Sequence, residues 1–353
     1  MKMHHPFLSK HSIIPKYTDW DQIFLRKPHI ITKERWTTSS SYYQPEFVKI
    51  FHRDEQNKEH YTYLSSMIQR NFNNKNTSYR YSITPDAIDT ITFGESFLSC
   101  YKTHSMMVMI PIYIHLKNGL YAYQSYYGDY MSTERTKRRN GDSAKLCYTT
   151  ACDIQKRKGT QVFLTKKEGI PLPLFVPLLS FYTYVYDITY WKSSFTLKPP
   201  FEIKECTTIR RVDFSPFSHR ISISHEHIEY GIQRKYFYVF ALHYKDECLG
   251  MFFFKEPHFS YKQKKAIESI GCILYKNYET CYAAFLYIIT TIFRDKYGYR
   301  TLLFEDIGHN VPLLKMLKEE YGELYTVSTF YYIYNFRMTS LEREMDRVFV
   351  LVP

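Results

Sequence analysis

Residues 129–143 read DYMSTERTKRRNGDS. This stretch and the helical pattern after it are the most informative part of the sequence about the fold. Strand-forming residues end near Met131, a basic turn containing Gly141 follows, and a helical pattern then runs through Ala144, Cys147 and Ala151. A strand that passes through such a turn into a helix points several backbone N–H groups at one place, where the helix dipole stabilises a pyrophosphate. The order of these elements therefore indicates a phosphate-binding loop.

The positive charge of this loop has two interpretations. Arg135, Lys137, Arg138 and Arg139 would supply the charge that the phosphates of coenzyme A need. On charge alone, such a run is more often a solvated face. The order strand, turn, helix favours the first interpretation.

The composition is that of a globular chain with a large aromatic share. Of 353 residues, 44% are hydrophobic and 23% are charged, which excludes wholesale disorder and leaves room for two domains. Thirty-five Tyr and 26 Phe stand beside only 12 Gly, and aromatic residues favour strands and large apolar pockets. We expect a β-rich fold with a roomy pocket.

Charge and cysteine usage limit the partners and the compartment. The net charge of +12 suits an anionic partner: nucleic acid, a phosphorylated cofactor or a membrane surface. Seven cysteines without a C-x-x-C pair argue against a zinc site and a disulfide framework, and so predict a reducing, cytoplasmic setting. No signal peptide is expected at residues 1–16, and prolines interrupt the apolar stretch 169–186, which excludes a membrane-spanning helix there.

Periodicity predicts an arm followed by two related halves. Residues 1–59 lack firm periodicity and are expected to wrap the core. In the first half, 60–195, a helix from residue 60, a strand at 79–83, a helix starting at Thr84-Pro85-Asp86 and two antiparallel strands at 106–116 and 121–131 are expected. The second half, 196–353, repeats this logic with a hairpin at 236–254, a buried helix at 278–294, a strand at 301–304, a helix at 311–319 and a final aromatic strand at 330–336. Two fused α/β halves are the simplest architecture.

The loop also resembles a known motif. The pattern R-x-x-G-x-S at residues 138–143 is similar to the R-x-x-G-x-G/A acyl-CoA loop of the GNAT acetyltransferase superfamily. Over most of its length the chain resembles the N-myristoyltransferases, whose fold is two fused GNAT-like halves. This resemblance implies an α/β (α+β) fold with a mixed, largely antiparallel central sheet, flanking helices and internal pseudo-two-fold symmetry.

Several collinear segments carry the resemblance. Residues 161–165, QVFLT, followed by 170–173, IPLP, are similar to the family's Q-A-V-Y-T-A-G and L-P-x-P segments. Residues 306–318 resemble D-L-M-E-N-x-x-F-L-x-x-L-K, and 331–336, YYIYNF, resemble Y-Y-L-Y-N-W. Counting back from residue 161 places the family's CoA-binding loop on Arg138, Arg139, Asn140, Gly141, Asp142, Ser143 and Ala144.

The resemblance implies a metal-free acyl transfer from myristoyl-CoA to the N-terminal glycine of a peptide or protein. The α-carboxylate of Pro353 would accept the proton of the glycine ammonium, because an amine is nucleophilic only when deprotonated. The backbone N–H groups of Tyr130 and Met131 would stabilise the oxyanion formed from the thioester. Asp129 and Thr165 complete the implied catalytic set, with acyl-CoA as cosubstrate and no permanently bound cofactor.

Departures from the family pattern leave alternatives open. Asp129 stands where the family has Asn, and the family's W-H-R block is replaced by Thr183-Tyr184-Val185, so a degenerate protein that binds acyl-CoA or acylated peptides without turnover is the main alternative. A basic nucleic-acid-binding protein is a further alternative, although the Lys, Arg and Tyr residues are dispersed. The pair His225-x-His227, expected on a strand, lacks the ligand set of a zinc enzyme. No P-loop, dinucleotide or G-x-S-x-G motif occurs.

Overall fold

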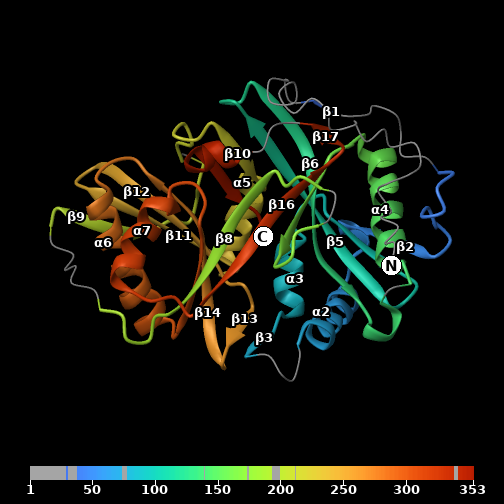
Figure 1. Ribbon diagram of the computed structural model, residues 1–353, viewed down its shortest axis with the longest axis horizontal. Helices are drawn as coiled ribbons and strands as arrows, with labels where there is room; N and C mark the ends of the chain where they lie inside the picture. Colours follow the sequence, from blue (N-terminus) through green and yellow to red (C-terminus); the bar gives the residue numbers. More distant parts are fainter. Residues whose placement is uncertain are drawn as a thin grey trace.

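The structure is a computed structural model that describes residues 29–30, 38–73, 78–138, 140–172, 175–192, 199–210, 212–337 and 341–353 (Figure 1). The first part of the chain contains β1 (His29–Ile30), β2 (Val48–His52), η1 (Arg53–Glu55), α2 (Lys58–Phe72), β3 (Tyr79–Tyr81), α3 (Pro85–Ile91), β4 (Phe97–Tyr101), β5 (Ser105–Leu116), β6 (Tyr121–Thr133), η2 (Arg135–Lys137), α4 (Asp142–Lys158), β7 (Phe163–Glu168) and β8 (Leu179–Asp187).

The second part contains β9 (Phe201–Glu205), β10 (His219–Ser222), α5 (His225–Gln233), β11 (Phe237–Tyr244), β12 (Glu247–Lys255), β13 (Phe259–Tyr261), β14 (Lys264–Leu274), α6 (Tyr278–Tyr287), η3 (Ile288–Lys296), β15 (Thr301–Glu305), α7 (Asn310–Glu320), β16 (Tyr325–Tyr334), β17 (Phe336–Arg337), η4 (Glu342–Arg347) and β18 (Val348–Leu351). The predicted hairpins at 106–131 and 236–254 are confirmed as β5–β6 and β11–β12.

One mixed sheet runs through the whole molecule. Its main path is β18-β10-β5-β6-β7-β16-β8-β15-β14-β12-β11-β9, and the described strands pair antiparallel except at β6–β7, β14–β15 and β10–β18. Helix α4 covers the sheet on one side of the molecule, and α6 and α7 cover it on the other (Figure 1). The predicted fold class, a largely antiparallel mixed sheet with flanking helices, is confirmed.

The two halves repeat one connection and exchange their last strands. In the first half β6 leads through α4 to the parallel strand β7, and in the second half β14 leads through α6 and η3 to the parallel strand β15. Strand β8 then pairs with β15 and β16, while β16 pairs with β7 and β8. The halves therefore share one hydrogen-bonded sheet, and the boundaries at residues 59 and 195 stay a prediction.

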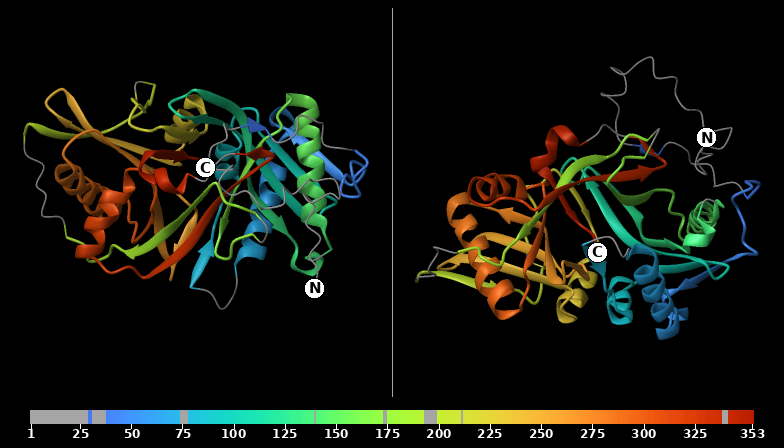
Figure 2. Two further views of the ribbon diagram at one scale, coloured as in Figure 1. Left: turned by 45° about the horizontal axis from the view of Figure 1, so that its top comes forward. Right: turned by 60° about the horizontal axis from the view of Figure 1, so that its bottom comes forward.

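Three apolar clusters hold the sheet and helices together. Leu146, Ala151 and Ile154 of α4 pack against aromatic and Met side chains of β4, β5 and β6. A second cluster, rich in Phe and Tyr, lies between α6, α7 and the strands of the second half. The largest cluster lines the inner face of the curved sheet and includes β18, whose end lies in the middle of the molecule between the halves (Figures 1 and 2).

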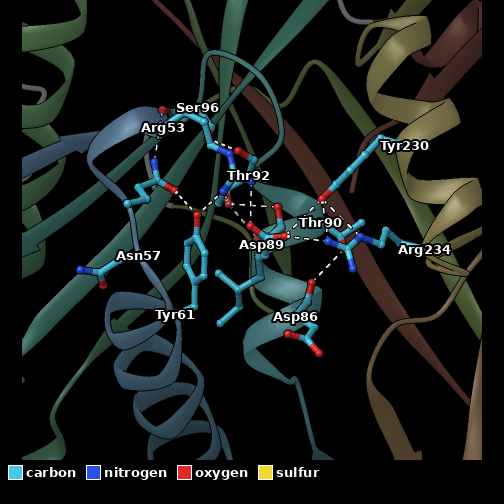
Figure 3. A network of polar contacts seen from close by, with 12 residues as sticks. Arg53, Asn57, Tyr61, Asp86, Asp89, Thr90, Thr92, Ser96, Tyr230 and Arg234 are labelled. Atoms are coloured by element: carbon cyan, nitrogen blue, oxygen red, sulfur yellow. Dashed lines mark hydrogen bonds and ion pairs between the residues drawn. The ribbon is translucent and has the colours of Figure 1, made fainter.

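A polar network also joins the halves (Figure 3). Asp89 of α3 accepts a hydrogen bond from Arg53 at 2.7 Å and one from the Tyr230 hydroxyl of α5 at 3.2 Å, and it lies 3.5 Å from Arg234. Arg53 also contacts Tyr61 of α2. This network ties α2, α3 and η1 to α5 of the second half.

Some predicted elements differ from the structure. The residues expected as an irregular arm include β2, which pairs with β4 in the sheet. The pair His225-x-His227 lies in helix α5 rather than on a strand, because the Ser224 hydroxyl accepts the His227 N–H at 3.2 Å and starts the helix. The helix expected at 278–294 changes at Ile288 into a π-helix. The strand expected last, 330–336, is followed by β18.

Candidate functional site

The end of β6 contains a β-bulge at the predicted oxyanion residues. Met106 pairs with Ser132 and Val108 pairs with Asp129, so β6 has one residue more than β5 between these pairs. The extra residue lies at Tyr130 and Met131, and Tyr130 has a φ of 48°, a left-handed conformation that is strained for a bulky side chain. Its N–H group donates a hydrogen bond to Asp129 Oδ1 at 2.7 Å.

Strands β6 and β7 pair only before this bulge. Their parallel ladder runs from Tyr126–Phe163 to Gly128–Thr165 and includes no later pair. The Thr165 hydroxyl donates to the Gly128 carbonyl at 3.3 Å. The pairing therefore places Thr165 opposite the residue that precedes Asp129, and the catalytic roles of Thr165, Asp129, Tyr130 and Met131 stay a prediction.

The predicted phosphate-binding loop precedes α4. Gly141 has a φ of 76° immediately before the helix, where a residue with a side chain would be strained. The Arg138 guanidinium donates to the carbonyl oxygens of Thr133 at 3.3 Å and Asn71 at 3.1 Å, and within the described part of the chain it forms no ion pair with a carboxylate. Its positive charge is thus held in place without being neutralised there. Arg139 lies outside the described residues.

The remaining loop residues have different surroundings. Asp142 is buried and its Oδ2 atom is hydrogen-bonded to His104 Nε2 at 2.8 Å, so its side chain anchors the start of α4. Asn140 is exposed, and Ser143 and Ala144 are partly exposed. Their backbone N–H groups lie at the helix start, where an anion is stabilised by the helix dipole.

A sulfur contact connects α4 to the bulge. Cys147, in the second turn of the helix, has its Sγ atom 3.3 Å from Met131 Sδ. The loop and the bulge therefore belong to one region at the end of β6. Pro353 is buried after β18, and two strands, β10 and β5, lie between β18 and β6 in the sheet.

A buried ionic cluster lies on the inner face of the sheet near this region, and sequence reasoning missed it. Lys166 of β7 lies 2.6 Å from Glu305 of β15 and 3.6 Å from Glu268 of β14. Lys255 of β12 lies 3.5 Å from the same Glu268 oxygen. The only signal in the sequence is a charged residue at the end of an apolar strand, as in Leu302-Leu303-Phe304-Glu305, which indicates a distant partner without identifying it.

The charges of this cluster shape the ionisation of its members. Burial opposes the charge on Lys166, but Glu305 and Glu268 outweigh it and hold the pKa of Lys166 above its ordinary value. Burial raises the pKa of Glu305. At Glu268 burial acts in the same direction, but the attraction of Lys255 and Lys166 outweighs it and lowers the pKa. Burial also raises the pKa of Asp129 to about 6, against the opposing effects of the Tyr130 N–H, Lys255 and Lys166.

Two cavities among the described residues lie away from the bulge and the loop. One of about 390 Å³ lies beside Arg53 and Asp89, and one of about 220 Å³ lies beside Arg220 and His115. Both have polar linings, so neither supplies the apolar pocket that the composition predicted.

Other features of the described residues bear on the predicted partners. All seven cysteines are free thiols. No three His, Cys, Asp or Glu side chains of the described chain group closely enough to hold a metal ion. Within the same residues, each helix is too short or too polar to span a bilayer.

The chain has the fold of the N-myristoyltransferases. By sequence it matches no family profile and is similar to no curated protein. Crystal structures of Saccharomyces cerevisiae N-myristoyltransferase nevertheless align with 90% of it. The structure with bound myristoyl-CoA has a TM-score of 0.64 at 13% identity and covers 90% of both chains. The structure with bound myristoyl-CoA and inhibitors has a TM-score of 0.67 at 12% identity and covers 90% of this chain and 87% of the yeast chain.

Proposed function

We propose that the chain is an acyltransferase that moves a long-chain acyl group, myristoyl first among them, from acyl-CoA to the N-terminal glycine amine of a peptide or protein. The observation that carries this proposal is the juxtaposition of the phosphate-binding loop, the start of α4 and the bulge at Tyr130 and Met131. The fold shared with yeast structures that hold myristoyl-CoA supports it.

The proposed chemistry divides between the loop and the bulge. Arg138 and the N–H groups at the start of α4 bind the phosphates of acyl-CoA. The Pro353 α-carboxylate takes the first proton from the glycine ammonium, and the amine then attacks the thioester carbon beside Thr165. The carbonyl oxygen becomes an oxyanion that the Tyr130 and Met131 N–H groups stabilise.

A second candidate function is binding of acyl-CoA or acylated peptides without turnover. The Tyr130 N–H, one of the two proposed oxyanion donors, is already hydrogen-bonded to the Asp129 carboxylate at 2.7 Å. A protein that keeps this bond during the reaction would stabilise the oxyanion poorly.

Two measurements separate these functions. Calorimetric titration with myristoyl-CoA tests binding, and a single-turnover assay with myristoyl-CoA and a glycine peptide tests transfer, with the N-acetylated peptide as the control because it has no free amine. Binding with transfer supports the proposal, and binding without transfer supports the second candidate. The absence of binding refutes both and favours the nucleic-acid interpretation.

The acyl chain and the base have their own tests. Burial of each methylene contributes roughly 0.8 kcal/mol, so each pair of carbons removed should weaken acyl-CoA binding about tenfold. Because Val352 and Pro353 are buried, truncation would disturb packing. Conversion of the Pro353 carboxylate to a carboxamide by intein-mediated amidation removes the base without changing the shape, and should slow transfer by about a hundredfold or more.

A further inference from the structure

The proposed reaction places a negative charge beside another negative charge. Asp129 directly precedes Tyr130 and Met131, whose N–H groups would bind the oxyanion, and its carboxylate accepts one of those N–H groups. A carboxylate that stayed ionised would repel the oxyanion and compete with it for the Tyr130 donor. The oxyanion takes over the Tyr130 N–H only when this carboxylate loses its charge.

The surroundings of Asp129 favour such a change. Within its electrostatic reach are Tyr127 and Tyr130 of β6, Lys166 and Glu168 of β7, Lys255 of β12, Tyr236 before β11 and Tyr331 of β16. The buried lysines are already shared with two glutamates, Glu305 and Glu268. The two lysines thus interact with Glu305, Glu268 and Asp129, and Lys166 also lies 3.9 Å from Glu168, so carboxylates outnumber the ammonium groups around Asp129.

The nitrogen loses two protons during the proposed reaction. An ammonium loses one proton before it attacks, and the nitrogen of the tetrahedral intermediate carries a positive charge until it loses a second. We propose that Asp129 is the acceptor of this second proton and thereby releases the Tyr130 N–H to the oxyanion. This inference rests on the proposed function and adds a catalytic residue to it.

The bonds, electrons and protons of the proposed reaction balance. When the C–N bond has formed, an N–H bond breaks, its electron pair stays on nitrogen, and a new O–H bond forms on Asp129. The uncharged acid is a weaker acceptor for the Tyr130 N–H. The C–S bond then breaks with its electron pair on sulfur, and the coenzyme A thiolate takes up one of the two protons. The other returns to water, so the overall reaction releases one proton.

The substitution Asp129→Asn tests the inference. Asparagine keeps the shape and an oxygen that can accept the Tyr130 N–H, but it takes up no proton. In the single-turnover assay with myristoyl-CoA and a glycine peptide, the rate with the unsubstituted chain should fall as the pH drops below about 6, where Asp129 is protonated before the reaction. The D129N rate should be about a hundredfold lower at pH 7.5 and should lack this fall. Calorimetric binding of myristoyl-CoA should be unchanged.

The control variant is Glu168→Gln, which removes a nearby charge without touching the bulge. Glu168 contributes to the raised pKa of Asp129, so E168Q should keep the rate at pH 7.5 and move the fall to lower pH. A D129N rate equal to or above that of the unsubstituted chain, or an unchanged pH profile in D129N, overturns the inference while the proposed function stands. No transfer by the unsubstituted chain at any pH defeats the proposed function itself.

Discussion

Replacement of Lys166 by Met should destabilise the fold more than most single substitutions, because it leaves buried carboxylates without their cation. The Lys166 side chain is 14% exposed, and those of Glu305 and Glu268 are 3% and 6% exposed. At an effective dielectric constant of 20, the contacts of 2.6 and 3.6 Å correspond to about 6 and about 5 kcal/mol of attraction.

The net cost is smaller than this attraction. The variant no longer pays to remove an ammonium group from water, which offsets several kcal/mol, and Glu305 can take up a proton. We therefore expect K166M to lose about 3–5 kcal/mol of unfolding free energy at pH 7. Because the pKa of Glu305 is raised in the folded chain and rises further without Lys166, the loss should shrink as the pH falls toward the ordinary pKa of a glutamate.

Urea denaturation followed by circular dichroism measures this loss. The matched control is Lys167→Met, the same substitution at the next residue of β7, whose ammonium donates to the exposed Glu168 carbonyl; it should change stability by less than about 0.5 kcal/mol. The double variant K166M/E305Q should recover about 2 kcal/mol relative to additivity. A K166M loss below about 1 kcal/mol, or strict additivity in the double variant, would refute the reasoning.

Three further predictions concern the loop, a buried histidine and the contact between the halves. R138A should weaken myristoyl-CoA binding about tenfold or more in calorimetry, while R157A at the other end of α4 should leave it unchanged. Equal affinities of R138A and the unsubstituted chain would exclude the loop as the phosphate-binding site. Burial lowers the pKa of His227 to about 4, so the unfolding free energy should fall by up to about 3 kcal/mol as the pH drops from 6.5 toward 4. Denaturation at several pH values should show that H227Q reduces this loss of stability and that H225Q does not. D89N should cost about 1–2 kcal/mol of unfolding free energy, since the Asp89 carboxylate of α3 accepts hydrogen bonds from Arg53 of η1 and Tyr230 of α5, and an unchanged midpoint would show that the network contributes nothing.

Local patterns in the sequence were sufficient for many of the elements. Thr84 before Pro85 predicted the start of α3, and the structure has the Thr84 hydroxyl capping that helix. The turn at Lys117, Asn118 and Gly119 predicted the β5–β6 hairpin, because a left-handed turn and two flanking apolar strands are encoded within a few residues. The two-halves interpretation came from the order of these local signals, and the fold comparison agrees with it.

Contacts between distant residues were outside the reach of such patterns. Lys166 and Glu305 are 139 residues apart, and β16 and β8 lie between their strands in the sheet, so only the tertiary structure brings the two side chains together. The helix of His225 and His227 was missed because a two-residue spacing is compatible with either element until the Ser224 cap is seen.

The sequence by itself determined the strand–turn–helix around Gly141 and the hairpins, because each depends on the conformational preferences of neighbouring residues. Only the tertiary structure decided that β8 and β16 cross between the halves, that Asp129 binds the Tyr130 N–H, and that two lysines face three carboxylates on the inner face of the sheet. The physical reason is that strand exchange and burial of charge depend on which distant segments share water-excluded space, and this is set by the packing of the whole chain.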